Sequence, residues 1–170
     1  ARKIAGKWTD VQNLGPDVNS DAFDAQPSLS SDGQTLYFVS DRDGGKGGTD
    51  IYATTRNSSG NWSKAVNISE LNSESDDMSP SISSDNSTIF ISSNRTGGQG
   101  GFDIYTTKRT SGMNFGALTN VRAPINSPAD EYFYSALPNS TTAYFSRTNA
   151  NGDLDVMTAV PNPYPSEPVL

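Results

Sequence analysis

Apolar and polar residues alternate along short stretches of the chain, and turns rich in glycine, serine and aspartate separate these stretches. Residues 26–30, 35–41 and 50–56 form one such series, whose period of two indicates β-strands. Residues 35–41 (TLYFVSD) carry apolar side chains on both faces, as expected of a strand that neighbouring sheets cover on both sides. Residues 7–14 and 61–68 have the pattern of outer strands. The period of about 3.6 residues that marks an amphipathic helix is absent.

The series is repeated along the chain. SLSSDGQTLYFVSDRDGGKGGTDIYATT, starting at Ser28, returns as SISSDNSTIFISSNRTGGQGGFDIYTT from Ser81, and a more divergent copy starts at Ser135. Trp8 recurs as Trp62 and Phe115, which gives a period of about 53 residues, close to the roughly 40–50 residues of a four-stranded propeller blade. We expect Trp8 and Trp62 to pack between blades. The sequence therefore predicts an all-β fold, with β-propeller blades of four antiparallel strands in three repeats: 7–60, 61–113 and 114–160.

The repeated unit resembles a known family. Its segments W-S-x-x-V-N, I-N-S-x-x-D-D, P-S-x-S-x-D-G-x-T-L-Y-F-x-S-D-R and G-G-x-G-G-x-D-I-Y are similar to the propeller repeat of TolB-like proteins, which also occurs in OmpA-associated envelope proteins of Gram-negative bacteria. The similarity is close over residues 7–113 and weaker over 114–160. It implies a periplasmic or outer-membrane-associated protein. It also implies a non-catalytic binding or scaffold module, or a structural part of a larger envelope complex, with a protein or peptidoglycan partner.

Three blades do not close a ring, since about four to eight are needed. Two arrangements stay open. A second copy can complete a ring of six blades, the number that the resemblance implies, with residues 7–14 of one copy finishing the last blade of the other. Alternatively, the chain is part of a longer propeller. Residues 161–170 (PNPYPSEPVL) form either a proline-rich linker or the remnant of an outer strand, because SEPVL is similar to WSKAVNI without its tryptophan.

Composition removes several classes of function. The chain has 19 acidic and 12 basic residues, a net charge of −7, and neither cysteine nor histidine. The acidic balance argues against nucleic acid and against anionic membrane surfaces, and no apolar run approaches the roughly 20 residues of a membrane-spanning helix. The missing residue types remove thiolate chemistry and the commonest general base and metal ligand. We expect no enzyme activity and no cofactor.

Acidic residues stand just before each predicted inner strand. Because inner strands line a propeller's channel, we expect these carboxylates to gather at one rim, to raise one another's pKa and to bind a cation or a basic partner. The alternative is that they cap turns. On the predicted inner strand of the third repeat, aromatic residues replace the small residues of the other repeats. Aromatic residues dominate binding hot spots. The predicted partner-binding residues of the channel rim are Asp24, Asp77, Asp130, Glu131, Tyr132 and Tyr134.

The glycine-rich loops after the second strand of each repeat suggest a wide hairpin turn with positive φ at several residues. We expect Asp50, Asp103 and Asp155 to accept hydrogen bonds from the turn amides. We expect Arg42 and Arg95 to pair with acidic neighbours between blades. A weak resemblance to a calcium loop makes Asp41, Asp43 and Asp50 candidate calcium ligands, although the oxygen ligands of an EF-hand are incomplete.

A glycan-acting enzyme is the alternative function. Glycosidases use paired carboxylates, and sialidase-like propellers carry S-x-D-x-G-x-T boxes. Ser30-Ser-Asp32-Gly33-Gln-Thr35 comes near this box, with its glycine one position early. The arginine cluster with which such enzymes bind a carboxylate is missing from the sequence, which favours a binding module.

Overall fold

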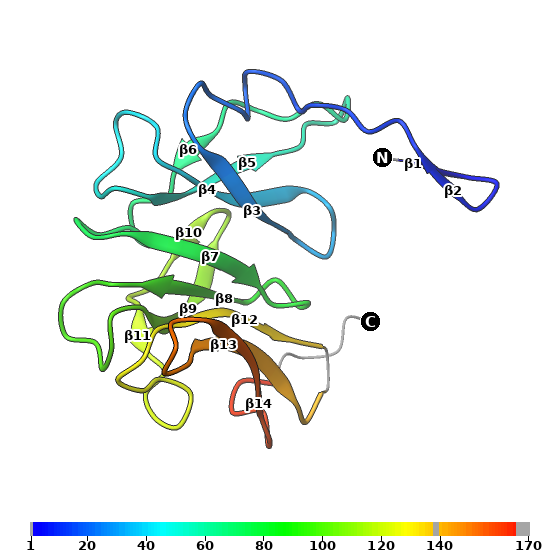
Figure 1. The fold of residues 1–170 in the computed structure, drawn as a ribbon. Helices are drawn as coiled ribbons and strands as arrows, with labels where there is room; N and C mark the ends of the chain where they lie inside the picture. Colours follow the sequence, from blue (N-terminus) through cyan, green and yellow to red (C-terminus); the bar gives the residue numbers. More distant parts are fainter. Residues whose placement is uncertain (1, 138–139, 166–170) are drawn as a thin grey trace.

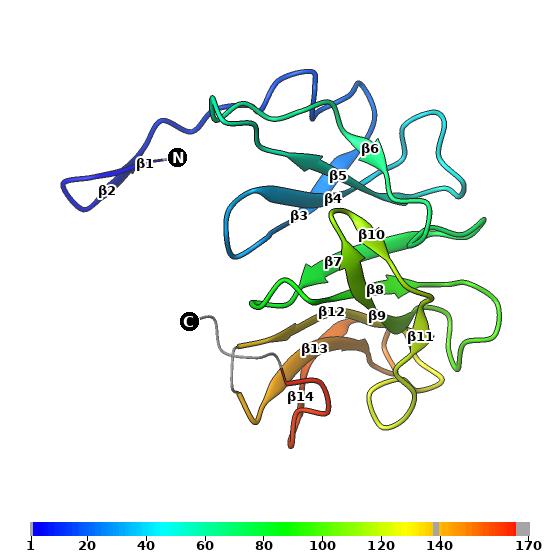
Figure 2. The ribbon, with the colours of Figure 1, turned by 180° about the vertical axis from the view of Figure 1, so that it is seen from behind.

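The computed structural model describes residues 2–137 and 140–165. These residues form strands, turns and loops but no helix, so none of them forms a helical membrane span. The strands make three antiparallel sheets stacked face to face, and a two-stranded hairpin at the N-terminal end extends away from the stack (Figure 1, Figure 2).

Each sheet corresponds to one repeat of the sequence. The first blade consists of β3 (Asp24–Leu29), β4 (Thr35–Ser40), β5 (Asp50–Thr55) and β6 (Val66–Asn67), in that spatial order. The second blade consists of β7 (Asp77–Ile82), β8 (Thr88–Ser93) and β9 (Asp103–Ser111), with β10 (Asn114–Phe115) and β11 (Thr119–Asn120) both paired with β9. The third blade consists of β12 (Glu131–Ala136), β13 (Ala143–Thr148) and β14 (Leu154–Ala159). The inner and middle strands follow the alternation in the sequence, which confirms the predicted all-β propeller blades.

The outer strands differ from the prediction. Only Val66–Asn67 pairs as a strand within the predicted segment 61–68, together with one isolated bridge between Arg56 and Trp62. The predicted outer strand 7–14 is wrong as a single element: β2 (Lys7–Thr9) pairs with β1 (Arg2–Ile4) in the hairpin, and residues 10–14 are not a strand.

The core lies between the blades. Every residue of β4 and of β8 is buried. A neighbouring sheet covers each face of β8, whereas the outer face of β4 is covered by a cluster that includes Val18 of the N-terminal connector and Tyr52 of β5. Tyr37 of the first blade meets Phe115 of the second edge to face, with ring centroids 5.9 Å apart. Phe90 of the second blade lies 4.3 Å from the ring of Tyr134 in the third. Tyr37 and Phe90 occupy the same position in the repeat, and each contacts an aromatic ring of the following blade, from the outer strand β10 in one case and from the inner strand β12 in the other.

The segment after β14 packs on the third blade. Asn162 accepts a hydrogen bond from the hydroxyl of Tyr134 at 2.7 Å, and the ring of Tyr164 meets Phe90 edge to face at 5.6 Å. Asn162 and Tyr164 therefore pack on the core, whereas Pro161, Pro163 and Pro165 are exposed. Residues 166–170, which decide between linker and outer strand, are outside the described residues.

Candidate functional site on the inner strands

The inner strands β3, β7 and β12 contact one another in sequence order, and each contains a bulge at the same position. Gln26, Ser79 and Phe133 occupy that position with φ of 53°, 52° and 58°. A left-handed conformation is uncommon for residues other than glycine and is a genuine outlier for a bulky one. The chain retains it three times, and in the third blade it places a phenylalanine there.

Polar side chains link the first two bulges. The Gln26 Oε1 atom accepts a hydrogen bond from the Ser79 amide at 2.6 Å, and the Ser28 hydroxyl accepts one from the Ile82 amide at 3.1 Å. These contacts tie the inner strand of the first blade to that of the second. The side chains of Gln26 and Ser28 on this part of the inner surface are therefore hydrogen-bonded to the neighbouring strand.

Aromatic residues replace this polar link in the third blade. Tyr132 lies 5.0 Å from the ring of Phe102 and 6.1 Å from that of Phe133, and Phe133 is 46% exposed. We call these three residues the aromatic patch. Strained backbone persists where the surrounding structure enforces it, often at binding sites. The exposed, strained Phe133 makes this patch the strongest candidate for a binding surface.

Asp130 holds the patch together. Its Oδ1 atom accepts a hydrogen bond from the Phe102 amide at 2.9 Å, which keeps Phe102 beside Tyr132. Burial, and then the negative charge of Asp130, raise the pKa of Tyr132 from 10.0 to about 12. Tyr132 therefore keeps its hydroxyl proton at neutral pH and can donate a hydrogen bond at the edge of the patch. Of the predicted rim residues, Asp130 and Tyr132 lie here, and their partner-binding role stays a prediction.

Three of the predicted rim carboxylates lie in another environment. Asp24, Asp77 and Glu131 form ion pairs with Arg42, Arg95 and Arg147, and the side chains of Asp77 and Glu131 are 0% exposed. Each carboxylate also accepts hydrogen bonds from the amide and hydroxyl of a serine four residues earlier: Ser20, Ser73 and Ser127. These carboxylates form buried links within the blades, so the expectation that they gather at one exposed rim is corrected.

Each arginine joins three parts of one blade. The Arg95 guanidinium donates to the Asp77 carboxylate at 2.5 Å, to the Leu71 carbonyl at 2.7 Å and to the Ser93 hydroxyl at 2.8 Å. It thereby ties the incoming connector to the inner strand and to the end of the second strand. The prediction that the arginines pair with acidic residues is confirmed, but the pairing lies within a blade, because the two strand ends concerned are neighbours in one sheet.

The pKa of Asp24 also differs from the prediction. Burial raises it, but hydrogen bonds from the Ser20 amide, Arg42 and Ser40 outweigh burial and lower the pKa below the ordinary value of 3.8. The predicted mutual raising by neighbouring carboxylates is wrong for Asp24, because a guanidinium and not a second carboxylate lies beside it.

We expect Asp24 to contribute to stability in a pH-dependent way. Because its folded pKa is lowered, the contribution is fully present above the unfolded value of 3.8 and is lost as the pH falls through the folded pKa. Urea unfolding of the parent chain and of Asp24→Asn, followed between about pH 6 and pH 3, checks this. The free energy of unfolding should fall less steeply with acid in the variant. Parallel curves would contradict the prediction.

The predicted Tyr134 is not at the rim. It is 1% exposed, packs on Phe90 and donates its hydroxyl to Asn162. Burial raises its pKa above the ordinary range, and the neighbouring Tyr164 raises it further. Glu131 and Tyr134 are both buried although they lie three residues apart, because the bulge at Phe133 shifts the alternation of β12 by one residue.

The glycine loops differ from the expected turn in how many of their glycines have positive φ. Only the first glycine of each loop, Gly44 or Gly97, has positive φ, at 90°. The others allow close approach: a Cβ on Gly47 would lie 1.8 Å from the Ser75 carbonyl oxygen, and one on Gly100 would lie 1.9 Å from that of Ala129. Each loop thus docks against the connector that leads into the following blade.

The aspartates of these loops behave as predicted in two repeats. Asp50 accepts hydrogen bonds from the amides of Lys46 and Gly47, and Asp103 accepts one from the amide of Gln99. In the shorter third loop, Asp155 accepts from the Asn149 side chain instead, and Asn149 itself binds the turn amides.

The calcium candidates do not converge. Asp50 is buried and bound to its own loop, Asp41 accepts from the Phe23 amide, and Asp43 is exposed. Across residues 2–137 and 140–165, no three acidic side chains are placed to hold a metal ion.

Neither Phe102 nor Phe133 is among the predicted partner-binding residues. A signal for Phe102 exists in the repeat, because Thr49 stands at its position in the first loop and carries no ring. Its meeting with Tyr132 depends on the loop docking onto the next connector, which the sequence pattern does not show.

Stacked antiparallel sheets built from one repeated unit define β-propeller blades, and the chain has the fold of the TolB propellers. The crystal structure of TolB from Acinetobacter baumannii superimposes with a TM-score of 0.57 and 15% identity, covering 81% of this chain and 30% of that one. A putative TolB from Agrobacterium tumefaciens gives a TM-score of 0.57 and 20% identity, covering 82% of this chain and 45% of that one. The chain therefore spans less than half the length of either protein.

Other comparisons add little. A puromycin hydrolase superimposes with a TM-score of 0.42 and 12% identity, a similarity too low to bear on activity. No protein-family model and no curated protein sequence matches the chain.

Proposed function

We propose that this chain is a non-catalytic protein-binding module of a bacterial cell envelope, and that its partner docks on the aromatic patch. The single observation that carries the proposal is Phe133, a large apolar side chain that is half exposed on a left-handed bulge. Strain of this kind costs about 1–3 kcal/mol and is retained where it serves a purpose. The TolB-like fold and the resemblance of the repeat support the envelope setting.

The patch suits a protein segment with apolar side chains. Phe102 and Phe133 offer apolar rings, and Tyr132 offers a hydroxyl donor between them. Asp130 adds a negative charge beside the patch, which favours a basic residue next to the apolar ones. A peptidoglycan or other glycan partner is the alternative that the binding experiment separates.

The outer face of the third blade carries exposed apolar side chains. Tyr144 of β13 and Val156 of β14 are 49% and 78% exposed on the outer face of the third blade. The corresponding residues of the second blade, Phe90 and Ile104, are covered by the third. In this proposal a second copy of the chain, or the remainder of a longer chain, covers this face and completes a ring.

Site-specific photocrosslinking tests the binding function. We expect a benzoylphenylalanine at position 133, in cells of an envelope-bearing bacterium, to give discrete adducts with one or a few proteins. Position 66 on the outer strand, a valine that is 42% exposed, is the matched control and should not give them. With the purified partner, Phe133→Ser should weaken binding by at least about tenfold, since a central aromatic anchor is removed.

Other outcomes would contradict the proposal. Identical adducts from positions 133 and 66 would show that the patch has no special role. Adducts with glycan strands alone would assign the patch to the cell wall. A glycan array followed by a turnover assay tests the alternative function. Release of product from any arrayed sugar would favour a glycan-acting enzyme.

A further inference from the structure

Each blade holds an arginine against a carboxylate and an aromatic ring at the same time. Arg95 donates to the Asp77 carboxylate, and its guanidinium carbon lies 5.0 Å from the ring centroid of Tyr105. A guanidinium suits both partners because its plane stacks on a ring while its N–H groups point at carboxylate oxygens. The other two blades repeat the arrangement, with Arg42 against Asp24, Phe38 and Tyr52, and with Arg147 against Glu131 and Phe145.

The aromatic patch offers the same two kinds of group on the surface, without an arginine. The Asp130 carboxylate lies at the end of the patch formed by Phe102 and Tyr132: it accepts from the Phe102 amide, and its charge acts on the Tyr132 hydroxyl. The two rings are 5.0 Å apart. Within residues 2–137 and 140–165, no lysine or arginine forms an ion pair with Asp130.

One oxygen of Asp130 is available, unlike those of the equivalent carboxylate in the preceding blade. Asp76 stands just before β7, as Asp130 stands just before β12. Asp76 Oδ1 accepts from the Thr49 amide at 3.0 Å, and Asp76 Oδ2 accepts from Asn94 Nδ2 at 3.2 Å. Thr148 occupies the position of Asn94 in the third blade and has no side-chain amide to donate. Asp130 Oδ2 therefore accepts no hydrogen bond from the described residues.

We infer that the aromatic patch binds an arginine side chain of the partner, whose guanidinium stacks on the ring of Phe102 and donates to Asp130 Oδ2. The Phe102 amide keeps its bond to Asp130 Oδ1. Lysine fits this site less well, because an ammonium is a compact, strongly hydrated charge with no plane to stack on a ring. The inference rests on the proposed function and deepens it, since it names the partner residue that the patch recognises.

Phe133 adds an apolar contact next to the arginine site. Tyr132 lies between the two phenylalanines, 5.0 Å from the ring of Phe102 and 6.1 Å from that of Phe133. Phe133 is 46% exposed and can cover an apolar side chain of the same partner segment. The segment that fits the whole patch therefore carries an arginine and an apolar residue close together.

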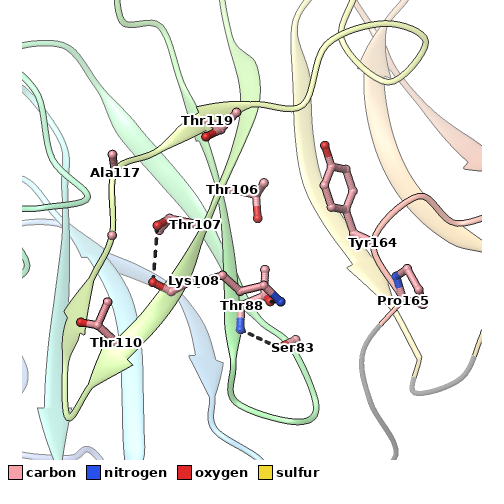
Figure 3. Close-up of a pocket in the computed structure, with 11 residues that line it drawn as sticks. Ser83, Thr88, Thr106, Thr107, Lys108, Thr110, Ala117, Thr119, Tyr164 and Pro165 are labelled. Atoms are coloured by element: carbon pink, nitrogen blue, oxygen red, sulfur yellow. Dashed lines mark hydrogen bonds between the residues drawn. The ribbon is translucent and has the colours of Figure 1, made fainter.

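The cavity between β9 and the segment after β14 has the opposite electrostatic character (Figure 3). It has a volume of about 440 Å³, with Thr106 and Lys108 on one side and Tyr164 on the other. Lys108 donates to the Thr88 hydroxyl at 2.9 Å, and no acidic residue of the described chain lines the cavity. A guanidinium placed there meets a like charge without a counterion, which disfavours binding. This cavity is therefore the reference surface in the experiment.

Nuclear magnetic resonance spectra of the intact chain, recorded with added N-acetylarginine amide, test the inference without an identified partner. The amide of Phe102 is the reporter because it is bonded to Asp130, and the amide of Thr106 in the cavity is the reference. We expect a saturable shift at Phe102 and none at Thr106. N-acetyllysine amide should bind at least about threefold more weakly, since it lacks the stacking plane. N-acetylcitrulline amide, which has the shape but not the charge, should give no saturable shift.

Two variants test the carboxylate. Asp130→Asn removes the charge but keeps an oxygen for the Phe102 amide, so the patch is retained. It should weaken the binding of N-acetylarginine amide at least about tenfold, because a hydrogen bond between two charged groups is lost. Asp76→Asn makes the same change at the equivalent position of the preceding blade and should leave the affinity unchanged. If Asp130→Asn does not fold, the comparison of the three compounds on the parent chain decides.

Equal binding of the arginine and lysine compounds, or an unchanged affinity in Asp130→Asn, would overturn the inference. Crosslinking from position 133 distinguishes this failure from a failure of the proposed function. Discrete protein adducts that keep their full yield in Asp130→Asn would leave the protein-binding function in place and remove the arginine. The absence of any discrete adduct from position 133 of the parent chain would contradict the proposed function itself.

Discussion

Arg95→Met should destabilise the chain by about 3–5 kcal/mol, because it leaves the carboxylate of Asp77 buried without its countercharge. The Asp77 side chain is 0% exposed, and Arg95 also binds the Leu71 carbonyl. The variant therefore separates the connector from the strand ends as well as breaking the ion pair. Urea unfolding followed by circular dichroism measures the loss.

Two control variants distinguish the loss of the buried ion pair from the loss of any arginine side chain. Arg56 is exposed, with its guanidinium 4.7 Å above the ring of Trp62, so Arg56→Met should cost about 1 kcal/mol or less. The double variant Asp77→Leu/Arg95→Met should regain part of the loss, since the unpaired charge is then gone. Equal losses from Arg56→Met and Arg95→Met would show that Arg95 is an ordinary surface residue.

Gly100→Ala should cost about 3 kcal/mol, at the upper end of the usual range for overpacking. Its Cβ would lie 1.9 Å from the Ala129 carbonyl oxygen, and backbone on both sides cannot yield without moving the loop from the third blade. Because Phe102 is held by the same docked loop, the variant should also disturb the aromatic patch. Unfolding curves measure the first effect, and near-ultraviolet circular dichroism measures the second.

Gly112→Asn is the matched control in the same blade. Gly112 has φ of 54° and open space where a Cβ would be, and asparagine tolerates this conformation. We expect a change of about 0.5 kcal/mol or less. If Gly100→Ala is equally mild, the glycine serves only the turn and not the docking of one blade on the next.

The sequence by itself determined the repeat and its strands. Alternation in TLYFVSD and its copies fixed which residues form the middle strands, since the period of a strand is local and a one-residue slip would expose the core face. It also determined that Arg42 and Arg95 have acidic partners and that Asp50 and Asp103 serve their own turns. Each of these contacts lies within one repeat.

Only the tertiary structure decided what happens between repeats. The sequence presents Asp77 and Asp130 as similar acidic residues, but one is buried against Arg95 and the other holds Phe102. The glycines at 47 and 100 look like turn residues until the loop meets the next connector. The exposure of Phe133 follows from a bulge that no local pattern marks. The contacts of Asp130 and of the glycine loops depend on how one blade docks on another, and the free energy of that docking comes from residues far apart in the chain.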